Sequence, residues 1–119
     1  MEIWFNPSCS KCRIGKGMLD EAGAEYDERR YLDEPPTEAE LERVLGLLGA
    51  EPWDITRFDE PRAKELDLKN AARDRAAWIR TLADNPILVQ RPIVVTDDGL
   101  AVVGRPPEKI LDLLRPPSG

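Results

Sequence analysis

The sequence contains no histidine among its 119 residues. This absence excludes Ser-His-Asp triads, cysteine–histidine catalysis and histidine metal ligands, so a reactive thiol would need arginine, lysine, backbone amides or a helix end for its activation. No apolar run approaches the roughly 20 residues that a membrane-spanning helix needs. No basic segment precedes the apolar opening Met1-Glu2-Ile3-Trp4-Phe5. We therefore expect no membrane span, no signal peptide and a cytoplasmic location.

Cysteine is scarce, and basic residues are outnumbered by acidic ones. The chain has two cysteines, 17 Lys and Arg, and 23 Asp and Glu, which leaves a formal net charge of −6. An acidic chain is a poor general binder of nucleic acid or of anionic membranes, so we expect neither as a direct partner. In a reducing cytoplasm, two cysteines are more often catalytic or metal-binding than joined in a structural disulfide.

The apolar pattern predicts a β-α-β unit at the start of the chain. Ile3-Trp4-Phe5 reads as a short buried strand, and a helix follows from Ser10 until Gly23 stops it. Glu25 to Tyr31 alternates as a second strand does. Within the helix, we expect one face to be buried, formed by Ile14, Met18, Leu19 and Ala22.

Helices are predicted to fill the middle of the chain, and a strand pair is predicted near its end. Thr37 and Glu40 have the spacing of a capping box that opens a mostly helical insert at about residues 37–85. Residues 92–96 form a strand, Asp97-Asp98-Gly99 is a hairpin turn, and residues 100–103 return antiparallel before a last helix. This order is typical of one α/β, thioredoxin-like domain over residues 1–119, with a mixed four-stranded sheet flanked by helices.

The two cysteines fall at the first strand-to-helix turn, in Asn6-Pro7-Ser8-Cys9-Ser10-Lys11-Cys12. The free amides and partial positive charge of a helix N-terminus favour a thiolate, and Lys11 and Arg13 add positive charge. Cys9 is best placed to have a depressed pKa. Three interpretations stay open: a working thiol, two buried small hydrophobic residues, or half of a zinc site completed by a dimer or carboxylates.

Three arginines are candidates for an anion site. Arg57 lies in the insert, Arg91 directly precedes the third strand, and Arg105 follows the fourth. Their planar forks could converge on a tetrahedral oxyanion, although surface pairing with acidic residues is the alternative. Arg91 is the least ordinary, because it interrupts an apolar run. The Arg91-Pro92 bond is also a candidate cis peptide.

Several motifs along nearly the whole chain resemble one known family. They are Asn6-Pro7-x-Cys9, Tyr31-Leu32-x-x-Pro35-Pro36-Thr37, Asn85-Pro86-Ile87-Leu88, Arg91-Pro92-Ile93-Val94-Val95 and Gly104-Arg105-Pro106. The family is that of the thioredoxin-fold, glutaredoxin-dependent arsenate reductases of the ArsC type, with the Spx and MgsR proteins as relatives.

The resemblance implies a chemistry for these positions. Cys9 matches the nucleophile that attacks arsenate, and Arg57, Arg91 and Arg105 match the arginines that bind the oxyanion. Arg13 matches a basic position after the nucleophile, and Asn6 is expected at the substrate site. The resemblance implies no bound cofactor or metal. An external reductant is expected instead, either glutathione with glutaredoxin, or one of the mycothiol or thioredoxin type.

The sequence departs from the reductase pattern at the cysteine loop. The reductases typically have one cysteine followed by small polar residues, and often a histidine before the asparagine, where this chain has Phe5. Cys12 could resolve a Cys9 adduct as a disulfide. Its presence also resembles the redox switch of Spx-like regulators that bind RNA polymerase, which is the second hypothesis. A general disulfide oxidoreductase is the third.

Overall fold

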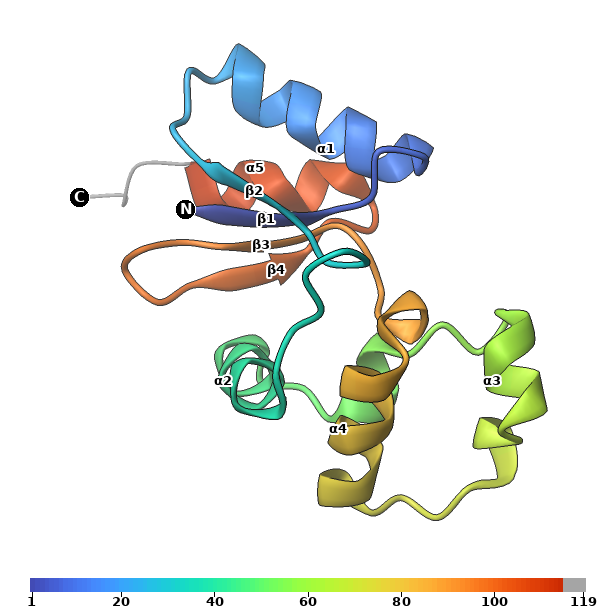
Figure 1. The fold of residues 1–119 in the computed structure, drawn as a ribbon. Coiled ribbons are helices and arrows are strands. Elements are labelled where there is room, and N and C mark those ends of the chain that lie inside the picture. Colours follow the sequence, from blue (N-terminus) through green and yellow to red (C-terminus); the bar gives the residue numbers. More distant parts are fainter. Residues whose placement is uncertain (115–119) are drawn as a thin grey trace. The chain divides into compact units, whose positions relative to one another are not determined.

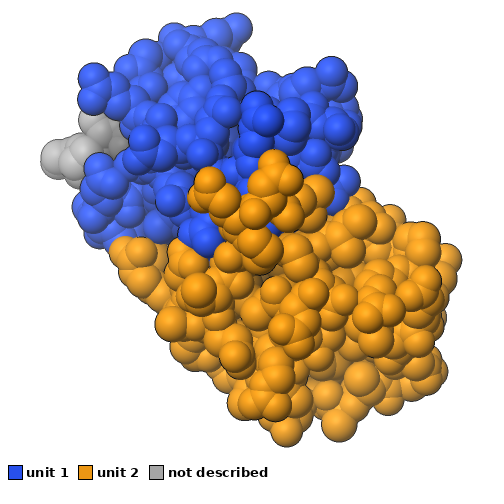
Figure 2. Space-filling view, in the orientation of Figure 1, with its two compact units in different colours: residues 1–31, 91–119 blue, residues 32–90 orange. Residues whose placement is uncertain are grey.

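The computed structural model describes residues 1–114, with the side chain of Leu114 left out. The chain forms two compact units (Figure 2): residues 1–31 together with the chain from 91 onwards, and residues 32–90. The first unit holds the sheet, and the second holds helices, turns and an isolated β-bridge between Thr56 and Val89 (Figure 1).

A four-stranded mixed sheet organises the first unit. Its strands are β1 (Glu2–Phe5), β2 (Asp27–Arg30), β3 (Ile93–Val95) and β4 (Ala101–Val103), in the order β2-β1-β3-β4. β1 and β2 are parallel and are joined by the helix α1 (Ser10–Glu21), whereas β1 with β3 and β3 with β4 pair antiparallel. The predicted hairpin at residues 97–99 is confirmed: the Thr96 amide donates to the Leu100 carbonyl at 2.8 Å, and Gly99 has a φ of 87°.

The buried face of α1 differs from the face predicted from its sequence. Cys12, Gly15 and Leu19 are buried, whereas Ile14 is 48% exposed. The reason is the close approach at Gly15, where a Cβ atom would lie 2.7 Å from the Ile110 Cδ1 and 3.2 Å from the Pro92 Cγ. Small residues therefore set this contact, and the larger Ile14 faces outwards.

Short helical turns complete the first unit after the sheet. The 3-10 helix η4 (Pro107–Ile110) leads into α5 (Leu111–Leu114), and Ile110 is completely buried against the core that contains Ile3 and Val94. Both the Arg91-Pro92 and Arg105-Pro106 peptide bonds are cis.

The second unit contains the helices between residues 32 and 90. They are α2 (Glu38–Leu48), η1 (Pro52–Ile55), α3 (Pro61–Glu65), η2 (Leu68–Asn70), α4 (Arg75–Asp84) and η3 (Pro86–Leu88). The predicted capping box is confirmed, since the Thr37 hydroxyl accepts from the Glu40 amide and the Glu40 carboxylate accepts from the Thr37 amide, both at 3.1 Å. A buried bond of 2.9 Å from the Trp78 indole to the Thr56 hydroxyl fixes α4 beside η1.

The strand register brings four chain segments to one edge of the sheet. Phe5, at the end of β1, pairs with Arg30, at the end of β2. Trp4 pairs with Ile93, which starts β3, and Ile93 pairs with Val103, which ends β4. The residues that follow β1, β2 and β4 and those that precede β3 therefore meet at this edge.

Candidate active site

The loop after β1 presents Cys9 at the start of α1. The Cys9 amide donates to the Asn6 carbonyl at 3.0 Å, and the Ser8 amide donates to the Asn6 side-chain oxygen, also at 3.0 Å. Cys9 is the N-cap residue, with extended backbone angles, and its carbonyl accepts the first helical bond from the Arg13 amide. Asn6 thus shapes the turn that aims Cys9 at the sheet edge.

The Cys9 thiol is acidic for a cysteine. Its side chain is only 8% exposed, and this burial raises its pKa, but the Arg91 guanidinium and the amide and thiol of Cys12 outweigh that effect. The pKa of Cys9 falls from its ordinary 9.0 to about 7. A large share of Cys9 is therefore ionised at neutral pH.

Cys12 behaves in the opposite way. It is completely buried, and this burial, together with the nearby Cys9 charge, raises its pKa to about 12 despite a backbone hydrogen bond from Asn6. Both cysteines are free thiols. Cys12 is thus a protonated thiol in the core that can donate towards the Cys9 sulfur.

Arg91 and Arg105 lie together at the same sheet edge as Cys9. The charges of Arg91 and Cys9 influence each other: burial lowers the pKa of Arg91, but the Cys9 thiol and the Tyr31 phenol raise it overall. The Arg105 Nε donates to the Arg91 carbonyl at 2.8 Å. The strand register and this bond therefore bring the Cys9 loop and the chain segments of Arg91 and Arg105 to one end of the sheet, and positive charge beside a thiolate can attract an anion.

Arg57 and Arg13, the two remaining predicted site residues, have surroundings that differ from those of Arg91 and Arg105. Arg57 belongs to the second unit, where its amide donates to the Leu88 carbonyl at 2.7 Å and its guanidinium forms an ion pair with Glu60. Arg13 is exposed on α1, one turn after Cys9. Their roles at a substrate remain predictions.

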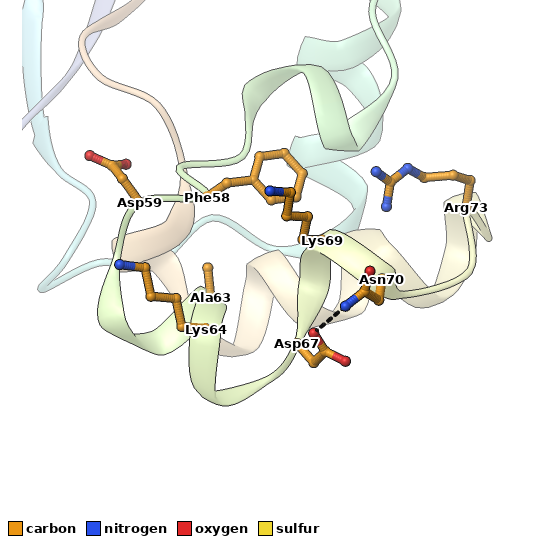
Figure 3. A pocket seen from close by; sticks show the side chains of 8 residues that line it. All are labelled: Phe58, Asp59, Ala63, Lys64, Asp67, Lys69, Asn70 and Arg73. Carbon is orange, nitrogen blue, oxygen red and sulfur yellow. Dashed lines mark hydrogen bonds between the residues drawn. The ribbon is translucent and has the colours of Figure 1, made fainter.

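Two features have no clear signal in the sequence. Tyr31 belongs to one of the family motifs, but a tyrosine after a strand signals no chemistry until the strand register is known. The second is a cavity of about 580 Å³ in the second unit (Figure 3), with Phe58, Lys64, Lys69 and Arg73 among its lining residues. None of the predicted site residues lines it. Arg73 is held there by donation to two backbone carbonyls and by the Trp78 ring, 4.8 Å from its guanidinium carbon.

A mixed sheet in this order, with a cysteine at the N-terminus of its first helix, defines a thioredoxin-like protein. The model of the ArsC family matches residues 4–113. The chain belongs to the ArsC family.

Individual relatives agree with this assignment. An arsenate reductase of Neisseria meningitidis is 40% identical over 111 residues, which cover 92% of this chain and 94% of that protein. An uncharacterised protein from the glnII region of Streptomyces viridochromogenes is 56% identical over 117 residues, or 96% and 98% of the two chains. The structure of the Vibrio cholerae arsenate reductase matches with a TM-score of 0.88 at 36% identity, covering 94% of this chain and 97% of that one. The predicted thioredoxin-like α/β fold is confirmed.

Membrane spans and metal centres are two other classes of feature that a chain of this size can carry. No helix within residues 1–114 is long and apolar enough to cross a membrane. Over the same part of the chain, no group of three or more Cys, Asp or Glu side chains could hold a metal ion.

Proposed function

We propose that this protein is a thiol-dependent arsenate reductase whose nucleophile is the Cys9 thiolate. The observation that carries the proposal is the position of Cys9 as the N-cap residue of α1, where Arg91 helps to lower its pKa to about 7. A thiolate is the reactive form of cysteine, and here Arg91 stabilises it, while Arg105 is bonded to the Arg91 backbone. The family's named relatives include arsenate reductases.

The reaction would proceed through a covalent adduct. The Cys9 thiolate attacks the arsenic of arsenate, an As–O bond breaks, and the departing oxygen leaves as water after protonation. An external thiol then attacks the sulfur of this Cys9–S–As(V) adduct. Arsenic takes the electron pair of the S–As bond and leaves as arsenite, and a mixed disulfide between Cys9 and the thiol remains. A redoxin with further thiol regenerates Cys9, so that two thiols are oxidised for each arsenate reduced.

The arginines would supply the electrostatic stabilisation. Negative charge on the arsenate oxygens increases as sulfur attacks, and guanidiniums fixed beforehand stabilise that charge without reorganisation. Arg91 also stabilises the attacking thiolate. Arg105 is anchored by its bond to the Arg91 carbonyl, and its other guanidinium nitrogens can face the substrate. Arg57 and Arg13 are proposed as further positive groups, and Asn6 as the residue that shapes the loop.

The thiol that resolves the adduct is proposed to be external. Cys12 is completely buried and its pKa is about 12, so its thiolate is scarce at neutral pH. Glutathione with glutaredoxin, mycothiol with its redoxin, and thioredoxin are the reductant systems to compare. All of them operate in the cytoplasm, which is the location that the cysteine usage predicts.

An arsenate turnover assay tests the proposal. Arsenite is measured with each of the three reductant systems, for the wild-type protein and for Cys9→Ser. We expect arsenite formation with at least one system and none above background for Cys9→Ser. Absence of arsenite with all three systems, from a folded protein with a reactive Cys9, would overturn the proposed function.

The two other hypotheses make different predictions. The relatives' descriptions give no support to an RNA polymerase partner. A regulator would bind polymerase in a way that changes on oxidation, and in Cys9→Ser the binding would no longer respond to oxidation. A general disulfide oxidoreductase would reduce protein disulfides equally well after Arg91→Ala, because disulfides need no anion site. Arsenate reduction that depends on Arg91 separates the reductase from both.

A further inference from the structure

The cavity in the second unit is formed within residues 58–73. Its volume of about 580 Å³ falls in the range of roughly 300–1,000 Å³ that is usual for sites of small organic molecules. The side chains that line it come from the segment before α3, from α3, from η2 and from the loop before α4 (Figure 3). The cavity is therefore a candidate binding site that one unit supplies by itself.

One wall of this cavity is apolar and aromatic. The Phe58 ring and Ala63, which is 2% exposed, line it. Behind Phe58 lies Trp78, with the two ring centroids 6.1 Å apart, and Trp53 meets Trp78 edge-on at 5.8 Å. The indole of Trp78 is fixed by its bond to Thr56. Because aromatic rings pack favourably on one another, a flat ring of a ligand can pack on Phe58.

Arg73 joins this aromatic wall to the charged part of the cavity. Its guanidinium carbon lies 4.8 Å from the centroid of the Trp78 ring and 5.8 Å from that of Phe58. Its Nη1 donates to the carbonyls of Leu68 and Ala71 at 3.2 and 3.1 Å. In the part of the chain that the structure describes, its Nε and Nη2 make no hydrogen bond. The charge is thus held in place, and two nitrogens can still donate to a ligand.

Two lysines add positive charge that the protein leaves unpaired. Lys64, on α3, and Lys69, on η2, line the cavity, and within residues 1–114 neither forms an ion pair or a side-chain hydrogen bond. Of the two carboxylates there, Asp67 accepts a bond of 2.9 Å from the Asn70 amide, and Asp59 is the other. Three cations against two carboxylates leave the lining net positive, in a chain whose formal net charge is −6.

We propose that this cavity binds a small aromatic carboxylate, with its ring on Phe58 and its carboxylate among Lys64, Lys69 and Arg73. The positive charges favour an anion over a neutral molecule of the same shape. The aromatic wall favours a flat ring over a saturated one. The planar fork of the arginine suits a carboxylate in particular. This site goes beyond the proposed function and does not depend on it.

The test titrates the full-length, isotopically labelled protein with benzoate and follows the indole N–H resonances by NMR. Trp53 and Trp78 belong to the aromatic cluster beside the cavity. Trp4 lies on β1 in the other unit, with its indole N–H bonded to Glu2, and is the internal reference. Two comparison ligands isolate the two parts of the proposal. Benzamide keeps the ring without the charge, and cyclohexanecarboxylate keeps the charge without the aromatic ring.

We expect benzoate to shift the Trp53 and Trp78 resonances in a saturable way and to leave Trp4 in place. The dissociation constant should be on the order of 1 mM, as the size of the probe allows. Benzamide and cyclohexanecarboxylate should each bind at least about threefold more weakly, because each lacks one of the two interactions. Added salt should weaken the binding of benzoate, since it screens exposed charges.

The variants test the named side chains. The Lys64→Glu/Lys69→Glu double variant should bind benzoate at least about tenfold more weakly, because repulsion replaces attraction. Phe58→Leu should bind it roughly two- to tenfold more weakly through loss of the ring contact. Lys109→Glu makes the same charge change at an exposed lysine of η4, in the other unit, and should leave the affinity unchanged. The dispersion of the indole resonances verifies that each variant is folded.

Three results would overturn the proposal. One is the absence of a saturable shift at the two indoles of the second unit. Another is equal affinity for benzoate and benzamide. The third is equal affinity in the wild type and in the folded double lysine variant, whose two exposed positions carry little risk to folding. Because benzoate binding involves no thiol chemistry, a protein that binds it as expected but reduces no arsenate would refute the proposed function and leave this site intact.

Discussion

The Arg105 Nε donates a hydrogen bond of 2.8 Å to the backbone carbonyl of Arg91. The end of β4 is thereby tied to the start of β3 at the sheet edge where Cys9 lies. Arg91 lowers the pKa of Cys9, whereas the Nε of Arg105 is engaged at the Arg91 backbone. The two arginines should therefore affect different steps: Arg91 the ionisation of the nucleophile, and Arg105 the binding of the substrate.

We predict that Arg105→Lys weakens arsenate binding and leaves the ionisation of Cys9 unchanged. Lysine keeps the charge but loses the Nε donor and the planar fork. The loss of one hydrogen bond to a charged group costs about 1.5–3 kcal/mol, which corresponds to roughly a 10- to 100-fold fall in kcat/KM. Steady-state kinetics and the Cys9 alkylation profile are measured together. A shift of the alkylation midpoint would contradict this division of roles.

Cys12 should be dispensable for resolving the adduct. With a pKa of about 12, only on the order of 1 in 10⁵ Cys12 side chains would be ionised at pH 7. Cys12→Ser and Cys12→Ala should therefore keep arsenate turnover within a few-fold when an external thiol is supplied. Mass spectrometry of the stalled reaction should show a mixed disulfide at Cys9. An intramolecular Cys9–Cys12 disulfide, with turnover lost in both variants, would show that Cys12 resolves the adduct.

Two glycines of α1 should respond oppositely to alanine. A Cβ atom at Gly17 would have nothing within 4 Å, whereas a Cβ at Gly15 would lie 2.7 Å from the Ile110 Cδ1. Gly17→Ala should raise the free energy of unfolding by about 1 kcal/mol through helix propensity. The free energy of unfolding of Gly15→Ala should be about 1–3 kcal/mol lower than that of Gly17→Ala, because overpacking displaces Ile110. Urea unfolding of both variants measures the difference, and equal stabilities would show that the contact between α1 and η4 is loose.

The capping box at Thr37 should stabilise the second unit without affecting the site. Thr37→Ala removes the acceptor of the Glu40 amide and should cost about 1 kcal/mol, whereas Thr37→Ser keeps a hydroxyl and should cost much less. Urea unfolding gives the two values. Cys9 alkylation should be the same in both variants as in the wild type. If Thr37→Ser lost as much stability as Thr37→Ala, the hydrogen bond would not be the cause.

Much of the fold and part of the site could be predicted from local signals. The apolar run at Ile3, the turn at Asp97-Asp98-Gly99 and the Thr37–Glu40 spacing each identify an element, and the β-α-β order places Cys9 at a helix N-terminus. Arg91 and Arg105 follow from the same logic once the strand order is assumed. These signals suffice because each depends on neighbours in the sequence.

The remaining features depend on contacts between distant residues. The close approach of Ile110 to Gly15 decides which face of α1 is buried, and this turns Ile14 outwards against its hydrophobicity. The burial that separates the pKa of Cys12 from that of Cys9 has the same origin. None of these contacts has a signature in the local sequence.

The central claim is that Arg91 makes Cys9 a thiolate at neutral pH, and a titration of Cys9 tests it most directly. The rate of Cys9 alkylation is measured against pH for the wild type and for Arg91→Ala. Since only the thiolate reacts, the rate should rise with pH to a plateau, with a midpoint near 7 in the wild type. The midpoint should lie clearly higher in Arg91→Ala. Burial still raises the pKa of Cys9 in this variant, whereas the group that lowers it most is absent. A wild-type midpoint near the ordinary 9.0, or one that Arg91→Ala leaves in place, would contradict the account.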